Sequence, residues 1–355
     1  MGIIDEAGLV RKGEELDQEK VVEFLNDSIP GLKGEIEIKQ FPGGFSNLTY
    51  LVKSGDYEMV LRRPPFGKKA RTAHDMSREY RILKALKPQF PCAPEVLVYS
   101  EDESVMGAPF YVMERVKGII LRKTIPDGVS ISPSDAGRLC ENLVSLHSKL
   151  HKVDYIAAGL ENFGKPEGYV FRQVDGWSKR YIAARTPDAP DFEKVMQWLH
   201  DKIQKDSSNP GVIHGDYKFD NVVLNPENPL EIIGVLDWEM ATIGDPLMDL
   251  GSSLAYWVNR DDPQNLQMIK QLCTTEEGML SRKEIIKLYG DMSGVNVENF
   301  DFYYCFGLFR LAVIAQQIYY RFFHGQTADK RFAMLIHAVK ILESTALDLI
   351  EKSEI

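Results

Sequence analysis

The sequence predicts an α+β protein of two lobes, a small one built on an antiparallel sheet and a larger, mostly helical one. Strand-like runs separated by short turns fill much of the first 114 residues. After Gly118 the apolar residues instead recur at helical spacing. The segment 114–118, where the period changes, looks like a hinge, which gives a first lobe of 1–116 and a second of 117–355.

The small lobe is expected to hold two helices and five strands. Asp17 is a suitable N-cap for a helix over 17–28, which Pro-Gly then stops. A second helix over 74–86 is expected because its apolar residues fall on one side. Alternation and β-branched or aromatic residues predict strands over 35–41, 48–53, 57–63, 95–99 and 109–114.

Helical periodicity accounts for most of the large lobe. Asp245-Pro246 marks a helix start, because aspartate is a common N-cap and proline is favoured at the first position. The most apolar segment, 302–323, is interrupted by polar residues such as Gln316, so we expect a buried helix rather than a membrane span. The other helices are expected over 134–151, 169–184, 192–205, 281–291 and 329–350.

Composition narrows the function classes. The chain has 355 residues with 44% hydrophobic content, enough for a large core. Its net charge of -10 argues against nucleic-acid binding, which needs a basic surface. The four cysteines form no CxxC pair, so they are most simply reduced core residues. The N-terminus lacks the apolar region of a signal peptide, and we expect a cytoplasmic protein with no membrane partner.

The most informative segment is 212–239. A short apolar run ends in His-Gly-Asp, whose aspartate is Asp216, and Asn221 follows five residues later. A second apolar run, 232–236, ends at Asp237. Two carboxylates and a carboxamide on the loops of a small hairpin suit a hard cation such as Mg²⁺. The order also fits phosphoryl transfer, with Asp216 facing an acceptor hydroxyl as base and Asn221 and Asp237 holding the metal.

His-Gly-Asp-x-x-x-x-Asn, followed by Leu-Asp-Trp-Glu at 236–239 and Gly-Asp-Pro-x-x-Asp-Leu at 244–250, resembles the aminoglycoside phosphotransferase family of kinase-like small-molecule kinases. The residues of these motifs are most similar to those of the phosphotransferase domain found in some acyl-CoA dehydrogenase family members. The resemblance implies a bilobal protein-kinase-like fold, ATP and Mg²⁺ as cofactors, and a small-molecule hydroxyl as acceptor. It also implies that Asp249 bonds backbone amides of the catalytic loop. The alternative for this segment is that His-Gly-Asp forms an ordinary turn and that Asp237 caps the end of a strand.

The resemblance also assigns nucleotide-binding positions in the small lobe. The glycine-rich turn between the first two strands resembles a phosphate-covering loop, because glycine lets backbone amides approach phosphate oxygens. Arg62 stands where the family carries a lysine, and arginine keeps the charge. Glu79 resembles the helix glutamate that pairs with this basic residue. The alternatives are a solvated strand-end arginine and a local helix ion pair. The expected residues are Gly43, Gly44, Phe45, Ser46, Asn47, Arg62, Glu79 and, through backbone contacts to adenine, Glu114 and Val116.

His147 and His151 stand one helical turn apart, a spacing that can bind a metal ion. The sequence offers no evident third ligand, and the pair lies at a helix end. Packing and capping are therefore the favoured interpretation.

The acceptor is open between two chemistries. Aminoglycosides are polycations and need a carboxylate-lined pocket, which the net charge permits without placing it. A hydroxyacyl-CoA, the acceptor class that the resemblance implies, carries phosphates and an apolar arm and needs arginines beside apolar surface. Two basic-aromatic sets on the predicted helices favour the second chemistry. Their residues are Trp177, Arg180, Tyr181, Arg310, Gln317 and Arg321.

Two other functions compete with a small-molecule kinase. A protein kinase is disfavoured because only seven residues separate Asp237 from Asp245, which leaves no room for a peptide-docking segment. A nucleotide-binding regulatory module without turnover is kept open by Arg62, although the complete set of Asp216, Asn221 and Asp237 argues against it.

Overall fold

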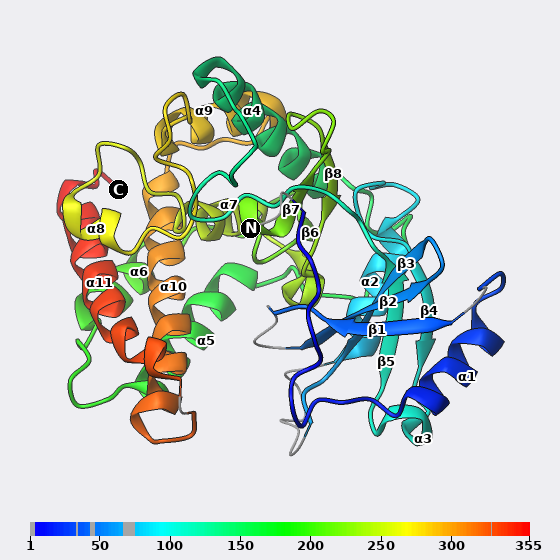
Figure 1. Cartoon of the computed structure of the whole chain (residues 1–355). Coiled ribbons are helices and arrows are strands. Elements are labelled where there is room, and N and C mark those ends of the chain that lie inside the picture. The colour runs from blue at the N-terminus through cyan, green and yellow to red at the C-terminus, as the bar shows by residue number, and fades with distance from the viewer. Residues whose placement is uncertain (1–3, 33–34, 43–46, 67–74, 328) are drawn as a thin grey trace. The chain divides into compact units, whose positions relative to one another are not determined.

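The computed structural model describes residues 4–32, 35–42, 47–66, 75–327 and 329–355 (Figure 1). Contacts divide the chain into two compact units. The first consists of the chain up to Ile120, residues 126–129 and Asn221–Ala241, and the second of residues 121–125, 130–220 and 242–355. Asp216 therefore belongs to the second unit, whereas Asn221 and Asp237 belong to the first. The lobe boundary at 116/117 stays a prediction.

An antiparallel five-stranded sheet forms the base of the first unit, in the order β1-β2-β3-β5-β4 (Figure 1). The strands are β1 (Ile36–Gln40), β2 (Leu48–Ser54), β3 (Tyr57–Arg63), β4 (Val96–Ser100) and β5 (Phe110–Glu114). Each agrees with its predicted range to within one residue at either end. The prediction of an antiparallel sheet at the start of the chain is confirmed.

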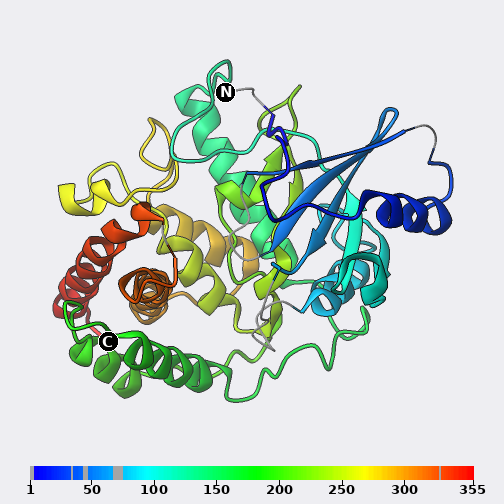
Figure 2. The ribbon, with the colours of Figure 1, turned by 60° about the horizontal axis from the view of Figure 1, so that its bottom comes forward.

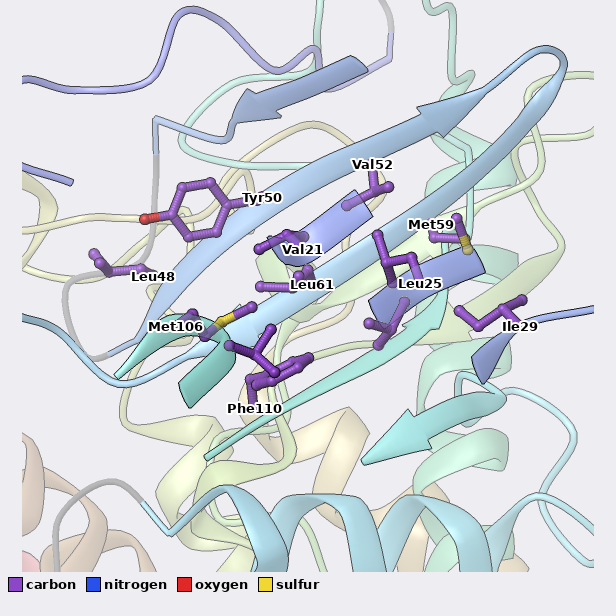
Figure 3. Close-up of a cluster of buried hydrophobic side chains, with 12 residues drawn as sticks. Val21, Leu25, Ile29, Leu48, Tyr50, Val52, Met59, Leu61, Met106 and Phe110 are labelled. Atoms are coloured by element: carbon purple, nitrogen blue, oxygen red, sulfur yellow. The ribbon is translucent and has the colours of Figure 1, made fainter. Parts of the chain in front are cut away.

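Helix α1 (Gln18–Ser28) packs on one face of this sheet. Its N-cap is Asp17, as predicted, and the Asp17 side chain accepts the amide of Lys20. Figure 3 shows Val21 and Leu25 of α1 turned toward side chains of the sheet. The cluster also includes residues of the short helix α3 (Glu103–Met106). Burial of these side chains contributes roughly 1.5–3 kcal/mol for each large aliphatic residue.

The opposite face of the sheet carries charge. Side chains alternate along a strand, so Leu61 lies in the α1 cluster while Arg62 turns to the other face. There it meets Glu79 of α2 (Met76–Leu86). The helix begins at Met76, with Asp75 as its N-cap, and the first predicted residue, His74, lies outside the described part.

A small hairpin completes the first unit. It consists of β7 (Val222–Leu224) and β8 (Ile232–Val235), followed by the 3-10 turn η2 (Trp238–Met240). Ile119 and Leu224 exchange both backbone hydrogen bonds, at 2.9 and 2.8 Å. This close approach requires Gly118, because a Cβ there would lie 2.3 Å from the Leu224 carbonyl oxygen. The expected small hairpin is present, and its second strand is the predicted apolar run 232–236. Its first strand is Val222–Leu224, whereas the apolar run before His-Gly-Asp lies in β6 (Gly211–Ile213) of the second unit.

The second unit is mostly helical. Strand β6 (Gly211–Ile213) pairs antiparallel with β9 (Thr242–Gly244). The loop that carries Asp216 follows β6 and ends at the 3-10 turn η1 (Phe219–Asn221). The helices are α4 (Pro133–His151), α5 (Tyr169–Ala184), α6 (Glu193–Asp201), α7 (Pro246–Leu254), α8 (Gln264–Met268), α9 (Arg282–Ser293), α10 (Phe300–Phe323) and α11 (Leu335–Lys352). Together with the sheet of the first unit, they confirm the predicted α+β class.

Two of the expected helices are shorter than predicted. Helix α6 ends at Asp201 rather than 205, and Asp206 accepts the amides of Gly168 and Val170 at 2.5 and 3.0 Å. Asp206 thereby caps α5, which begins after a glycine, so the segment must leave the helix to reach it. The helix expected over 329–350 begins instead as the 3-10 turn η3 (Lys330–Met334) before α11.

Helix α10 runs through the interior of the second unit. Figures 1 and 2 show it beside α11. It crosses α7 at two glycines: a Cβ on Gly307 would lie 2.1 Å from the Gly251 carbonyl oxygen. The prediction of a buried helix is confirmed, and no helix among the described residues is long and apolar enough to cross a membrane. None of the four cysteines, all within the described residues, forms a disulfide, and Cys140, Cys273 and Cys305 are buried.

Candidate functional site

Arg62 is the centre of a buried charge cluster in the first unit. Its Nη1 donates to Oε1 of Glu79. Its Nη2 lies 3.2 Å from Oδ1 of Asp237 and 3.9 Å from Oε2 of Glu239. Arg62 is 7% exposed and Glu79 2% exposed, so water scarcely screens the pair. The predicted pairing of these two residues is confirmed, and the alternative of a solvated strand-end arginine is wrong.

Burial and charge set the protonation of this cluster. Burial alone would lower the pKa of Arg62, but Glu79 and its other neighbours raise that pKa well above its usual value. Burial also raises the pKa of Glu79, against the opposing effect of Arg62. The guanidinium therefore stays charged, and it is the group that keeps a carboxylate in this dry position.

Asp237 has a left-handed backbone, with φ 67° and ψ 64°. This conformation is costly for a residue other than glycine and is common at functional sites. In the ladder, Val222 lies opposite Val235, and the Leu236 amide donates to the Asn221 carbonyl at 2.8 Å. Asn221 and Asp237 therefore lie at the same end of the hairpin. A carboxamide oxygen and a carboxylate there fit the donor set of Mg²⁺.

The remaining nucleotide positions are only partly described. Gly43, Gly44, Phe45 and Ser46 lie outside the described residues. Asn47 donates from Nδ2 to Oε2 of Glu239 at 3.0 Å. Glu114 accepts the Lys87 ammonium at 2.6 Å and the amide of Glu95 at 2.8 Å. The predicted backbone contacts of Glu114 and Val116 to adenine stay predictions.

Asp249 fixes the loop that carries Asp216 in the second unit. It follows the N-cap Asp245, which accepts the Leu247 amide at 2.8 Å, as the Asp-Pro start of α7 predicts. The Asp249 carboxylate accepts the amides of His214 and Gly215, each at 2.8 Å. This confirms the contact that the family resemblance implies for Asp249.

Lys218 neutralises the carboxylates of this loop. Its Nζ lies 2.5 Å from Oδ2 of Asp216 and 3.2 Å from Oδ1 of Asp220. The Lys218 side chain is only 10% exposed. Burial alone would lower its pKa, yet Asp216 and Asp220 raise that pKa above the usual value, so the ammonium is permanently charged. Sequence reasoning did not single out Lys218, although a lysine two residues after the proposed base was a usable signal.

Glu239 is the second residue that sequence reasoning did not assign. It lies between Asn47 and Arg62, and thereby links the start of β2 to β3 and the hairpin. Its position in the Leu-Asp-Trp-Glu segment, two residues after Asp237, was the available signal.

The predicted acceptor residues separate into two groups. Arg310 is buried, donates to the Gly215 carbonyl at 2.6 Å and stands 5.1 Å from the Trp177 ring centroid. Arg180 stands 4.7 Å from the centroid of the same ring. The two predicted basic-aromatic sets therefore meet at Trp177.

Tyr181, Gln317 and Arg321 do not join that cluster. Tyr181 is completely buried, and its hydroxyl donates to the Pro190 carbonyl at 2.6 Å, so it is a core residue and the prediction that it binds substrate is wrong. Gln317 is half-buried and Arg321 exposed. Eleven residues at 1.5 Å rise place Arg321 about 16 Å along α10 from Arg310.

Sequence comparison places this site in a known family. The profile of the phosphotransferase enzyme family matches residues 37–284. Acyl-CoA dehydrogenase family member 11 of Homo sapiens is 34% identical over 348 residues, which cover 95% of this chain and 43% of that protein. Acyl-CoA dehydrogenase family member 10 of Mus musculus is 34% identical over 340 residues, covering 95% and 31%. The chain thus spans less than half the length of these relatives.

Solved structures share the fold. A protein of Ralstonia eutropha, provisionally described as an aminoglycoside phosphotransferase, matches with a TM-score of 0.81 and 28% identity over 96% of this chain and all of that one. Choline kinase of Cryptosporidium parvum matches with a TM-score of 0.63 and 13% identity over 95% and 96%. The predicted kinase-like fold is confirmed. Because the family profile covers more than half of its length, the chain belongs to the phosphotransferase enzyme family.

Proposed function

We propose that this protein transfers the γ-phosphoryl group of Mg-ATP to a hydroxyl of a small molecule. The observation that carries the proposal is the loop of Asp216, held by Asp249 through two backbone amides and neutralised by Lys218. A loop fixed in this way places a carboxylate without reorganisation during the reaction.

In the proposed reaction, a carboxylate oxygen of Asp216 accepts the proton of the acceptor hydroxyl. The acceptor oxygen then forms a bond to the γ-phosphorus, while the bond from that phosphorus to the β–γ bridging oxygen breaks and ADP leaves. Lys218, which lies 2.5 Å from Asp216, would orient this carboxylate and supply a positive charge beside the transferred group.

The first unit supplies the nucleotide side of the proposal. Arg62 would steady the phosphates, and Glu79 holds the Arg62 fork in place. Asn221 and Asp237 would hold Mg²⁺, since an amide oxygen and a carboxylate at one end of a hairpin fit its oxygen preference. When bound, the cation neutralises charge on the phosphate oxygens.

The proposed acceptor is an anionic alcohol, with a hydroxyacyl-CoA as the leading class. The guanidinium groups of Arg180 and Arg310, each near the Trp177 ring, support this choice, because guanidinium groups on an aromatic ring can bind phosphate or carboxylate beside apolar surface. The Arg310 bond to Gly215 puts this cluster beside the residue that precedes the proposed base. An aminoglycoside would instead bring positive charge to two arginines, which repel it.

The test is turnover with defined acceptors. The purified chain with Mg-ATP and either a hydroxyacyl-CoA or kanamycin is analysed for ADP and for phosphorylated product by mass. We expect product from the first acceptor, and a loss of about 10²–10⁴-fold for Asp216→Asn with ATP binding retained. Wild-type turnover by a folded Asp216→Asn variant would remove Asp216 from the mechanism. Efficient phosphorylation of kanamycin without binding of CoA esters would reverse the choice of acceptor.

A second test separates catalysis from a regulatory module that only binds nucleotide. We expect Asp237→Ala to weaken Mg²⁺-dependent ATP binding more than Asn221→Ala, because aspartate brings a full charge and asparagine a dipole. Calorimetric titration of ATP with and without Mg²⁺ measures this. Retained Mg²⁺ dependence in both variants would put the metal elsewhere, and ATP binding without turnover of any acceptor would favour the regulatory module.

A further inference from the structure

The second unit contains a buried cluster that joins two helices to the loop of Asp216. His147 and His151 stand one turn apart on α4, and Asp249 lies in the first turn of α7. Nε2 of His147 lies 3.0 Å, and Nε2 of His151 3.1 Å, from the same oxygen of Asp249, Oδ2. All three residues are at most 7% exposed.

The hydrogen bonds fix which ring nitrogens carry protons. A carboxylate only accepts, so each histidine presents Nε2–H to Asp249. The second nitrogen of His151, Nδ1, then accepts the Tyr289 hydroxyl of α9 at 2.7 Å. His147 instead stacks on Tyr217, with ring centroids 4.0 Å apart. Burial and the neighbouring His151 lower the pKa of His147 to about 4, so its ring is neutral at pH 7.

The same three residues also have the ligand types of a metal site, with their ligand atoms within 4.8 Å of one another. Two histidines one turn apart with an aspartate are a common zinc set. A coordinating Nε2 carries no proton, whereas an Nε2 that donates to Asp249 keeps its proton, so the two arrangements differ in where the protons lie. The carboxylate also accepts the amides of His214 and Gly215. It thus receives four donors, three of them on Oδ2 and one on Oδ1.

We propose that His147 and His151 are positioning residues for phosphotransfer: they clamp the Asp249 carboxylate, which in turn fixes the backbone of the Asp216 loop. Asp249 alone can rotate about its side-chain bonds. With two rigid imidazoles on Oδ2, the carboxylate has one orientation, and both loop amides are held at 2.8 Å. The histidines therefore act on the base through Asp249 and do not touch the substrate.

Removal of one imidazole is expected to loosen the loop without affecting the nucleotide side. The expected result for His151→Leu is a fall in kcat of about 10- to 100-fold with little change in KM for ATP, because small displacements of a base are costly. His151→Gln should recover most of kcat, since the glutamine amide can donate near the Nε2 position. Tyr289→Phe removes only the outer hydroxyl and should cost less than His151→Leu. His337→Leu, at an exposed histidine of α11, should change nothing.

Two measurements on the wild-type protein do not depend on activity, so they separate this proposal from the proposed function on which its kinetic test rests. NMR of ¹⁵N-histidine-labelled protein should show a proton on Nε2 of both rings, with His147 neutral at pH 7, and elemental analysis should find no zinc. A ring without a proton on Nε2, a protonated His147, or one equivalent of zinc lost to a chelator, would overturn the proposal. So would wild-type kcat in a folded His151→Leu variant, or equal losses in the leucine and glutamine variants.

Discussion

The buried pair of Arg62 and Glu79 gives the sharpest prediction about stability. Glu79→Ala leaves an almost fully buried guanidinium with Asp237 at 3.2 Å and the more distant Glu239 at 3.9 Å. Breaking a buried ion pair from one side typically costs about 3–5 kcal/mol. Because Asp237 retains part of the compensation, we expect a loss near the lower limit, about 3 kcal/mol of unfolding free energy.

The double variant should behave differently. Arg62→Met with Glu79→Leu removes both charges and refills the space with apolar atoms of similar size. Such replacements are often neutral or stabilising. We expect unfolding free energy within about 1 kcal/mol of the wild type, although phosphotransfer should be lost. Stability and activity would thereby separate in a single protein.

The assay must report on the first unit alone. The chain has four tryptophans, and among them only Trp238 belongs to the first unit, where it is buried against Phe90 with ring centroids 5.9 Å apart. In protein labelled with fluorotryptophan, the ¹⁹F resonance of Trp238 therefore reports the unfolding of the first unit in urea. Lys87→Met provides the control, because the Lys87–Glu114 pair is about one third exposed and should contribute less than about 1 kcal/mol. If Glu79→Ala costs no more than this control, or if the double variant loses the sum of the single losses, the reasoning fails.

Three further predictions follow from other contacts. Arg62→Lys should keep part of the activity, because the charge remains, and Arg62→Ala should keep little; equal rates for alanine and wild type would make the residue structural. Lys218→Met should lower kcat, because it removes the ammonium that lies 2.5 Å from Asp216 and 3.2 Å from Asp220; an unchanged kcat in a folded variant would contradict this. The pKa of His147, lowered to about 4, means that the unfolded chain binds the proton first as pH falls, so urea unfolding should show a loss of about 2 kcal/mol between pH 7 and pH 5 that is absent in His147→Gln.

The fold could be predicted because its signals are local. The strands of the sheet are indicated by alternation or by runs of β-branched and aromatic residues. The charged residue Arg62 on β3 lies on the face opposite the α1 core, as the period of two requires. Helix caps such as Asp17 and Asp245 can be recognised in the sequence because the amides that they accept lie within the next three residues. The end of α6 was missed because its cause is distant: Asp206 leaves the helix to cap α5.

The site was harder to predict where partners are far apart in sequence. His147 and His151 offered a metal-like spacing without a third group, and that group, Asp249, stands 98 residues after His151. Only the folded chain shows that Asp249 contacts both rings and that its carboxylate also accepts two backbone amides. The prediction for Tyr181 failed for the opposite reason, because a neighbour in sequence was misleading. Its place beside Arg180 in sequence looks like a binding set, yet the helix turns it into the core.

The arginine that replaces the family's lysine on β3 has a geometric consequence. A lysine ammonium is a single point, and it would have to divide one position between Glu79 and the hairpin. The guanidinium of Arg62 has two separate terminal nitrogens, so Nη1 donates to Glu79 on α2 while Nη2 donates to Asp237. Through one rigid plane, α2, β3 and the strained turn at Asp237 are joined. The departure from the family pattern thus adds a link between the helix and the proposed metal ligand, which a lysine at the same position would supply only in part.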